Sequence, residues 1–369
     1  MKELRHPILL IIALILLSCN KKNVEVQDPN VLATGFTIPW AIEVIGEEEF
    51  LITERLGQLY HYQNGNLNEL ANMPKVKTVS DGYLTYGGLM DVSLHPQFES
   101  NRWVYITYVG LDWAMRVARF ALHDNTAKGF RVIFESNAFS IGSRIAWQDD
   151  EHFFVSQGSG GNPYPEPGGQ DLNSDVGKIH RLTADGYVPA DNPIFEGHTQ
   201  PSSIWSYGHR DPQGLYYDAS AGILYSNEHG PLGGDELNII HRGANYGWPI
   251  FSNGRNYDET PVSSMTEMEA AQISELPIEY WTPSIAPSCL TILQSSKFDD
   301  YNGSFIMGSL SQQSIMAYDQ STGRTKKLWA GIGRVRDIAE LPSGNLVVLI
   351  DKGSPKDANV GRVLKLDSY

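Results

Sequence analysis

Pairs of apolar stretches joined by a polar turn recur along the chain from residue 38 onward. The first pair is IPWAIEVIGEEEFLITERLGQLYHY (38–62), in which a polar turn separates two apolar runs. Five more pairs follow, at 87–110, 142–161, 212–230, 286–310 and 334–353. Their starts lie roughly 50 to 75 residues apart, the range of four-stranded propeller blades that carry insertions. Each pair therefore predicts two adjacent strands of one blade.

Six such pairs predict an all-β fold, a six-bladed β-propeller of four-stranded antiparallel blades over residues 34–369. A β-sandwich is the alternative, but it gives no reason for six similar hairpins. Abundant Gly and Pro beside many aromatic residues fit short strands joined by turns. We expect the strand before Trp40 to pair with strands near 361–367 and so close the ring. Ligands of propellers bind where loops from all blades converge on the central channel.

The N-terminus has the pattern of a targeting segment. Lys2 and Arg5 precede a short apolar run (8–17), and the sequence LLSC then ends at Cys19. This pattern resembles a bacterial lipoprotein signal (1–18) that is cleaved before Cys19, followed by a polar tether (19–33). An ordinary signal peptide is the alternative. The lipoprotein interpretation places the protein in the bacterial cell envelope, facing the periplasm or the exterior and held to the membrane by lipid.

Net charge and motif content exclude several classes of function. The formal net charge of −15 argues against nucleic acid as a partner, because an acidic surface repels phosphate backbones. The sequence contains no His/Cys cluster typical of zinc, no glycine-rich phosphate loop and no G-x-S-x-G elbow.

Two dense stretches carry the most informative chemistry, IWSYGHRDPQGLYYD (204–218) and EHGPLGGDELNIIHRGANYGW (228–248). Shorter motifs accompany them: TERLG, GLMDVSLHP, GSRIA, WTPSIAPS and RVRDI. In order and spacing they resemble the soluble PQQ-dependent sugar dehydrogenases, the glucose/sorbosone dehydrogenase family that includes the aldose sugar dehydrogenases. The resemblance extends over nearly the whole mature chain.

The resemblance implies pyrroloquinoline quinone (PQQ) as the cofactor, a planar quinone with three carboxylates. Arginine provides the fork of donors that carboxylates require. The family's cofactor-binding arginines fall on Arg210, Arg334 and Arg336, and His229 is a further candidate for contact with the cofactor.

Calcium is the second implied cofactor. Calcium takes several oxygen ligands, backbone carbonyls among them. In the family, the carbonyls of a Gly-Pro pair hold the calcium of the cofactor, and here the pair is Gly230 and Pro231. A second, structural calcium site would involve Glu236 and Tyr246, with Asp235 as an additional ligand. An ordinary acidic surface turn is the alternative.

Several positions depart from the family pattern. The general base of the family is a histidine, and the resemblance places Ser140 at its position; a serine is no base without a partner. Asp211 and His229 are the candidates for a relocated base. Three further family residues, a substrate glutamine, a cofactor-binding lysine and an acid, are replaced by Tyr86, Ser311 and Ser159.

Three functions therefore compete. The first is PQQ- and calcium-dependent oxidation of an aldose or related sugar. The second is a redox-inactive propeller that binds a carbohydrate or another small ligand, and the third is a structural or interaction lipoprotein. The family often dimerises, so a homodimer is compatible with the resemblance.

Overall fold

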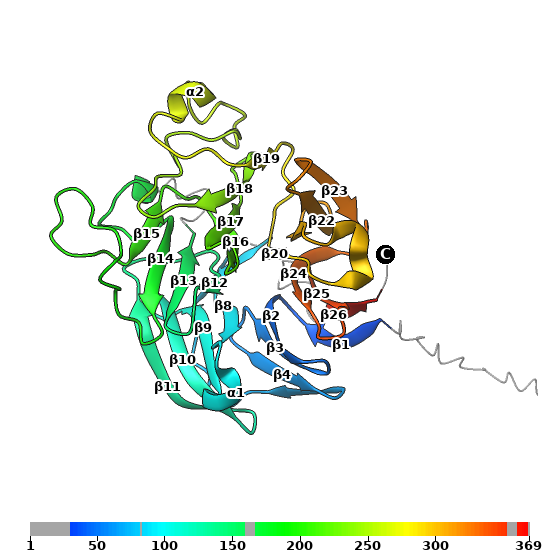
Figure 1. Cartoon of the computed structure of the whole chain (residues 1–369). Helices are drawn as coiled ribbons and strands as arrows, with labels where there is room; N and C mark the ends of the chain where they lie inside the picture. Colours follow the sequence, from blue (N-terminus) through cyan, green and yellow to red (C-terminus); the bar gives the residue numbers. More distant parts are fainter. Residues whose placement is uncertain (1–29, 82, 159–166, 353–359, 368–369) are drawn as a thin grey trace, which may run out of the picture.

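The computed structural model describes residues 30–81, 83–158, 167–352 and 360–367. Six four-stranded antiparallel sheets are arranged around a central axis (Figure 1). The prediction of a six-bladed β-propeller is thus confirmed. In chain order, the blades are β2-β3-β4-β5, β8-β9-β10-β11, β12-β13-β14-β15, β16-β17-β18-β19, β20-β21-β22-β23 and β24-β25-β26-β1.

The bounds of the blade strands are β1 Val31–Phe36, β2 Pro39–Gly46, β3 Glu49–Glu54, β4 Leu59–Gln63, β5 Asn66–Glu69, β8 Leu89–Leu94, β9 Trp103–Val109, β10 Met115–His123, β11 Thr126–Glu135, β12 Ile145–Trp147, β13 His152–Gln157, β14 Lys178–Thr183, β15 Ile204–Tyr207, β16 Pro212–Asp218, β17 Ile223–Glu228, β18 Asp235–Ile240, β19 Glu279–Trp281, β20 Thr291–Ile292, β21 Phe305–Ser309, β22 Ser314–Asp319, β23 Arg324–Leu328, β24 Arg334–Glu340, β25 Leu346–Asp351 and β26 Gly361–Leu366.

Each of the six sequence pairs contains the first two strands of one blade. These strands are buried on both faces because neighbouring blades pack against them, so they are continuous apolar runs rather than alternating ones. All six residues of β25 are buried, for example. The outer strand β5 is exposed throughout and carries Asn and Glu.

The N-terminal strand closes the ring, as predicted. β1 is the outermost strand of the last blade and pairs antiparallel with β26, with Val31 opposite Leu364 and Phe36 opposite Gly361. Figure 1 shows the two strands side by side. Because β1 begins at Val31, residues 31–33 belong to the propeller and not to the tether that the sequence predicted for 19–33.

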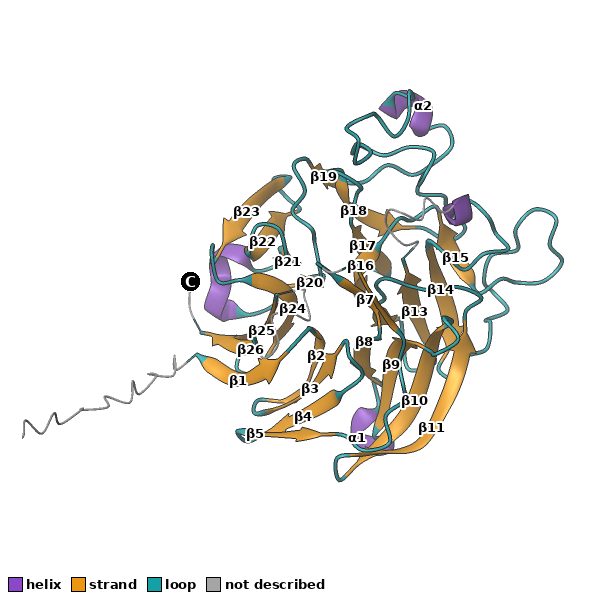
Figure 2. Cartoon of the chain, turned by 180° about the vertical axis from the view of Figure 1, so that it is seen from behind, coloured by secondary structure: helices purple, strands orange, loops and turns teal. Residues whose placement is uncertain are grey.

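Elements outside the blades are few. A hairpin of β6 (Thr78–Ser80) and β7 (Thr85–Gly87) precedes the second blade, and β7 lies near the centre of the ring in Figure 2. Two one-turn helices, α1 (Phe98–Asn101) and α2 (Glu267–Ala270), lie at the periphery. No helix among the described residues is both long and apolar enough to span a bilayer. Cys19 and Ser159 lie outside the described residues.

Candidate active site in the central channel

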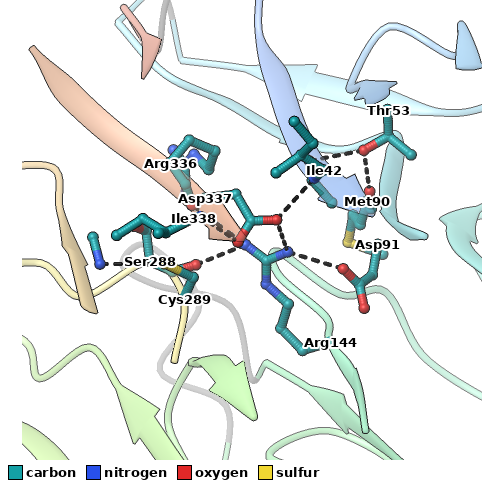
Figure 3. A network of polar contacts seen from close by, with 12 residues as sticks. Ile42, Thr53, Met90, Asp91, Arg144, Ser288, Cys289, Arg336, Asp337 and Ile338 are labelled. Atoms are coloured by element: carbon teal, nitrogen blue, oxygen red, sulfur yellow. Dashed lines mark hydrogen bonds and ion pairs between the residues drawn. The ribbon is translucent and has the colours of Figure 1, made fainter. Parts of the chain in front are cut away.

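Arg144 is surrounded by polar groups from several blades (Figure 3). Its Nη1 donates to Asp91 Oδ1 at 2.9 Å and to Asp337 Oδ2 at 3.0 Å, and these carboxylates come from β8 and β24. Its Nε donates to the carbonyl of Gln213 and its Nη2 to that of Ser288. One buried guanidinium therefore ties together groups from five blades.

The first blade joins this network through Asp337. The backbone N–H of Ile42 in β2 donates to Asp337 Oδ2 at 2.9 Å. Sequence reasoning used GSRIA only as a family motif and gave Arg144 no role. Its partners lie 53 to 193 residues away along the chain, so no local pattern indicates them.

Three more arginines gather at one end of the channel. Arg336 Nε donates to Asp351 Oδ2 at 2.7 Å, and Arg334 Nε donates to Asp351 Oδ1 at 3.1 Å. The guanidinium carbons of Arg55 and Arg336 lie 3.8 and 4.3 Å from the centroid of the Trp40 ring. Arg334 and Arg336 are thus brought together, as the resemblance implies.

Arg55 is a site residue that the sequence reasoning missed. It is buried, its Nη1 donates to the carbonyl of Gly87, and its Nε has no hydrogen-bond partner among the described residues. Burial, together with the positive charge of Arg336, lowers its pKa to about 9. Arg55 directly follows β3, a position from which side chains reach the channel mouth. Its place at the end of a predicted strand was therefore the signal in the sequence that could have identified it as a site residue. An anion placed here would relieve the repulsion between the two guanidiniums.

Arg210, Asp211 and His229 meet beside this cluster. Arg210 Nη1 donates to the carbonyl of His229 at 3.0 Å. Asp211 is buried; its Oδ2 accepts a hydrogen bond from Gln213 Nε2, and its Oδ1 has no partner among the described residues. Gln213 in turn accepts a bond from Arg336 Nη1 at 2.9 Å. Gln213, which the sequence did not single out, therefore connects the cofactor candidate Arg336 with the candidate base Asp211.

The tautomer of His229 follows from its contacts. Its Nε2 lies 2.8 Å from the carbonyl oxygen of Pro287, and a carbonyl only accepts, so Nε2 carries the hydrogen. The other nitrogen, Nδ1, is therefore the basic one in the neutral ring, and it lies 3.9 Å from Asp211 Oδ2.

Ser140 lies in a buried segment that precedes β12. Its side chain is fully buried, and its hydroxyl donates to the carbonyl of Gly142 and accepts from the N–H of Gly158 at 3.1 Å. The hydroxyl is thus used to hold a turn. The catalytic position that the resemblance implies for Ser140 stays a prediction.

The Gly230–Pro231 turn is built from closely packed backbone. A Cβ on Gly230 would lie 2.1 Å from the carbonyl oxygen of Gly233 and 2.4 Å from that of Gly234, so only glycine fits there. The N–H of Gly230 donates to Asp235 Oδ1. The other oxygen of Asp235 accepts from Ser284, Ile285 and Ala286. The carboxylate of Asp235 thus shapes the loop, and the calcium ligation that the resemblance implies for it stays a prediction.

Glu236 lies close to a second buried acid. Asn238 Nδ2 donates to Glu236 Oε2 at 3.1 Å and to Glu228 Oε1 at 3.2 Å. Burial, and next the negative charge of Glu228, raises the pKa of Glu236. A cavity of about 10 Å³ lies between these acids, Gly230, Gly234 and Tyr246. The hydroxyl of Tyr246 donates to the carbonyl of Ile239 and accepts from the N–H of His241, which leaves only its backbone carbonyl for a metal.

Acidic and histidine side chains alone do not form a metal site in the part of the chain that the structure describes. No group of three or more His, Cys, Asp or Glu side chains is arranged there to hold an ion. Any calcium would therefore depend largely on backbone carbonyls.

The remaining departures from the family pattern have local roles. Tyr86 lies in β7, and its hydroxyl donates to Asp81 Oδ2 at 3.0 Å. Ser311 is exposed and donates to the carbonyl of Ser284.

Comparison with known proteins identifies relatives over almost the whole chain. Residues 36–360 match the family model described as Glucose / Sorbosone dehydrogenase. The chain is 37% identical to the uncharacterized protein slr1608 of Synechocystis, over 94% of this chain and 88% of that protein. It is 33% identical to the aldose sugar dehydrogenase YliI of Escherichia coli, over 88% of this chain and 90% of that protein.

Solved structures of aldose sugar dehydrogenases are similar to this chain over nearly its whole length. The apo-form of the soluble aldose sugar dehydrogenase of Escherichia coli superposes with a TM-score of 0.79 at 31% identity, over 92% of this chain and 99% of that one. The PQQ-bound aldose sugar dehydrogenase of Streptomyces coelicolor gives a TM-score of 0.72 over 91% of this chain and 96% of that one. At 24% identity, the second likeness supports the fold alone.

Proposed function

Because the chain belongs to the glucose/sorbosone dehydrogenase family, we propose that it oxidises a sugar at a hydroxyl-bearing carbon with PQQ as its cofactor. The observation that carries the proposal is the excess of guanidinium groups at one end of the channel. Arg334 and Arg336 share a single carboxylate, Asp351, while a buried Nε of Arg55 lacks a partner among the described residues. A planar tricarboxylate fits such a site.

The roles of this chain's residues follow from that fit. Bound PQQ would supply a quinone that takes up the hydride from the sugar carbon. Arg334, Arg336 and Arg210 would bind its carboxylates, and Gln213 would keep Arg336 oriented through the 2.9 Å bond. The proton released from the sugar hydroxyl requires an acceptor, and the available groups are Oδ1 of Asp211 and Nδ1 of His229.

Calcium fits two places in the same region. Neither the carbonyl of Gly230 nor that of Pro231 accepts a hydrogen bond among the described residues, so both are available to an ion beside the cofactor. The paired acids Glu228 and Glu236 share one amide donor next to the small cavity, and a divalent cation there would offset their repulsion. We include both ions in the proposal.

We further propose that lipid on Cys19 anchors the protein in the cell envelope. The support is the sequence pattern at 8–19. A Cys19→Ala variant that remained in the membrane fraction would contradict the anchor.

The function is tested by adding PQQ and calcium to the purified protein. Cofactor binding is measured by titration calorimetry, and turnover is measured as dye reduction with a panel of aldoses. We expect the wild-type protein to bind PQQ and to oxidise at least one of the aldoses.

Arg334→Gln should weaken PQQ binding roughly 10- to 100-fold, the loss expected for a hydrogen bond to a charged group. The control is Arg131→Gln, since Arg131 is a half-exposed arginine on β11. Absence of PQQ binding would overturn the proposal, whereas binding without turnover would indicate a ligand-binding protein.

A further inference from the structure

Large aromatic side chains are exposed around the mouth of the channel. Tyr83 is 81% exposed, Tyr257 54% and Trp113 47%. They come from three separate segments: the turn of the β6–β7 hairpin, the long connection between β18 and β19, and the turn between β9 and β10. Exposed apolar surface that is contiguous, in contrast to single scattered side chains, marks interaction sites and ligand-binding grooves.

The hairpin that carries Tyr83 is held in place by one acid. Asp81 Oδ1 accepts the backbone N–H groups of Tyr83 and Leu84, both at 2.7 Å. Asp81 Oδ2 accepts the hydroxyl of Tyr86 at 3.0 Å. These bonds fix the backbone N–H groups of Tyr83 and Leu84 and the hydroxyl of Tyr86 against Asp81, which lowers the entropic cost of binding a ligand at Tyr83.

The backbone of Trp113 adopts a strained conformation. Its φ is +74°, a left-handed conformation that bulky residues rarely adopt. Its ring lies 5.9 Å from that of Phe139 and 4.6 Å from Lys77 Nζ. Phe139 in turn lies against Gly87 of the hairpin, because a Cβ there would come within 2.7 Å of its ring. Trp113, Phe139 and the hairpin thus form one continuous surface.

This surface leads into the proposed active site. The hydroxyl of Tyr257 accepts a hydrogen bond from Arg210 Nη2 at 3.3 Å. Tyr86, on the same hairpin as Tyr83, lies near enough to Tyr257 and Asp211 to interact with them electrostatically. Burial and the bond to Asp81 raise the pKa of Tyr86 to about 12.

We infer that Tyr83, Trp113 and Tyr257 form a carbohydrate subsite outside the channel, so that the substrate is an oligosaccharide whose reacting sugar unit enters the channel. The inference rests on the proposed function. Sugar rings present flat C–H faces that pack on aromatic rings, and hydroxyls that bond to polar groups. Lys77 Nζ lies over the Trp113 ring, and Asp81 binds the backbone of Tyr83. Rings separated by such polar groups suit a sugar chain better than a continuous apolar partner surface.

Kinetics with sugars of increasing length test the inference. Wild-type protein loaded with PQQ and calcium is assayed with glucose, maltose and maltotriose. We expect Trp113→Gly and Tyr83→Ala to raise KM for maltotriose about 2- to 10-fold while kcat and the KM for glucose stay unchanged. Trp113→Phe should restore most of the loss. The matched control is Tyr187→Ala, because Tyr187 is 73% exposed but lies in the β14–β15 connection, a segment that contributes nothing to the subsite.

Two further measurements distinguish a sugar subsite from a purely structural role of Trp113. Trp113→Gly relieves the left-handed backbone, so its melting temperature should equal or exceed that of the wild type. Maltotriose binding to the cofactor-free protein, followed by tryptophan fluorescence, should weaken in the same variant. Binding that depends on Trp113 without turnover of any sugar would support the subsite and overturn the dehydrogenase. Turnover with KM values that are independent of chain length and of Trp113 would overturn the subsite alone.

Discussion

At the scale of single residues, the structure changes the interpretation of Ser140. The resemblance aligned Ser140 with a catalytic histidine, so the sequence raised the question of a lost base. In the structure, both hydrogen-bonding functions of this hydroxyl are used inside a fully buried turn, by Gly142 and Gly158. The resemblance could identify the position but not the direction of the side chain, which depends on how the third blade packs.

Replacing Ser140 therefore tests burial rather than catalysis. Ser140→His should destabilise the protein by about 1–3 kcal/mol, because a larger side chain must enter a filled space. Ser140→Ala should cost about 1 kcal/mol, since the N–H of Gly158 loses one of its two acceptors and keeps the carbonyl of Gly142. Chemical denaturation measures both, with Ser100→His on the exposed surface as the control. If Ser140→His kept full stability and increased sugar turnover, the position would face the substrate after all.

At the scale of elements, the regular parts were predictable and the irregular parts were not. Paired apolar runs located the first two strands of each blade, because their side chains are buried on both faces. Outer strands such as β5, which is exposed throughout and has three polar residues out of four, leave no such signal. The β6–β7 hairpin consists of two three-residue strands, too short to show a period, yet it borders the channel.

Ring closure by β1 and β26 is the element on which the propeller's stability should depend most. Val363 in β26 is fully buried between β1 and β25, so Val363→Ala should destabilise the protein by about 2 kcal/mol. Val360→Ala, the same change at a position that is 42% exposed, should change the stability by less than about 0.5 kcal/mol. Thermal unfolding of the two variants provides the comparison. Equal melting temperatures would show that closure contributes little.

At the scale of the whole molecule, acids gather in a cavity apart from the arginines of the proposed cofactor site. Arg55 and Arg336 gather at Trp40, and Arg334 shares Asp351 with Arg336. Arg144 binds Asp91 and Asp337. The cavity, of about 290 Å³, is lined by the carboxyl groups of Glu43, Asp91, Asp337 and Glu340. These acids come from three different blades, so no pattern along the chain indicated that they would meet. The guanidinium of Arg144 offsets the negative charge of two of these acids directly, through ion pairs with Asp91 and Asp337.

Glu43 is the acid in this cavity that should dominate the pH dependence of stability. Burial, and then the charges of Asp91 and Asp337, raises its pKa to about 8 from an ordinary value near 4.5. Between these two values the folded state binds one proton more than the unfolded state. The contribution of Glu43 to the free energy of unfolding is therefore fully present at low pH. It is lost as pH rises toward 8, by at most about 1.4 kcal/mol per pH unit.

A Glu43→Gln variant isolates this contribution, because the amide keeps the shape of the side chain and does not ionise. Urea denaturation of the cofactor-free protein at intervals from pH 5 to pH 8 should give a shallower loss of stability in the variant than in the wild type. The backbone N–H of Leu94 keeps an acceptor, the amide oxygen, so stability at pH 5 should change little. Exposed Glu99 of α1 provides the control, since Glu99→Gln should leave the slope unchanged. Parallel curves for wild type and Glu43→Gln would mean that this carboxyl ionises normally in the folded protein.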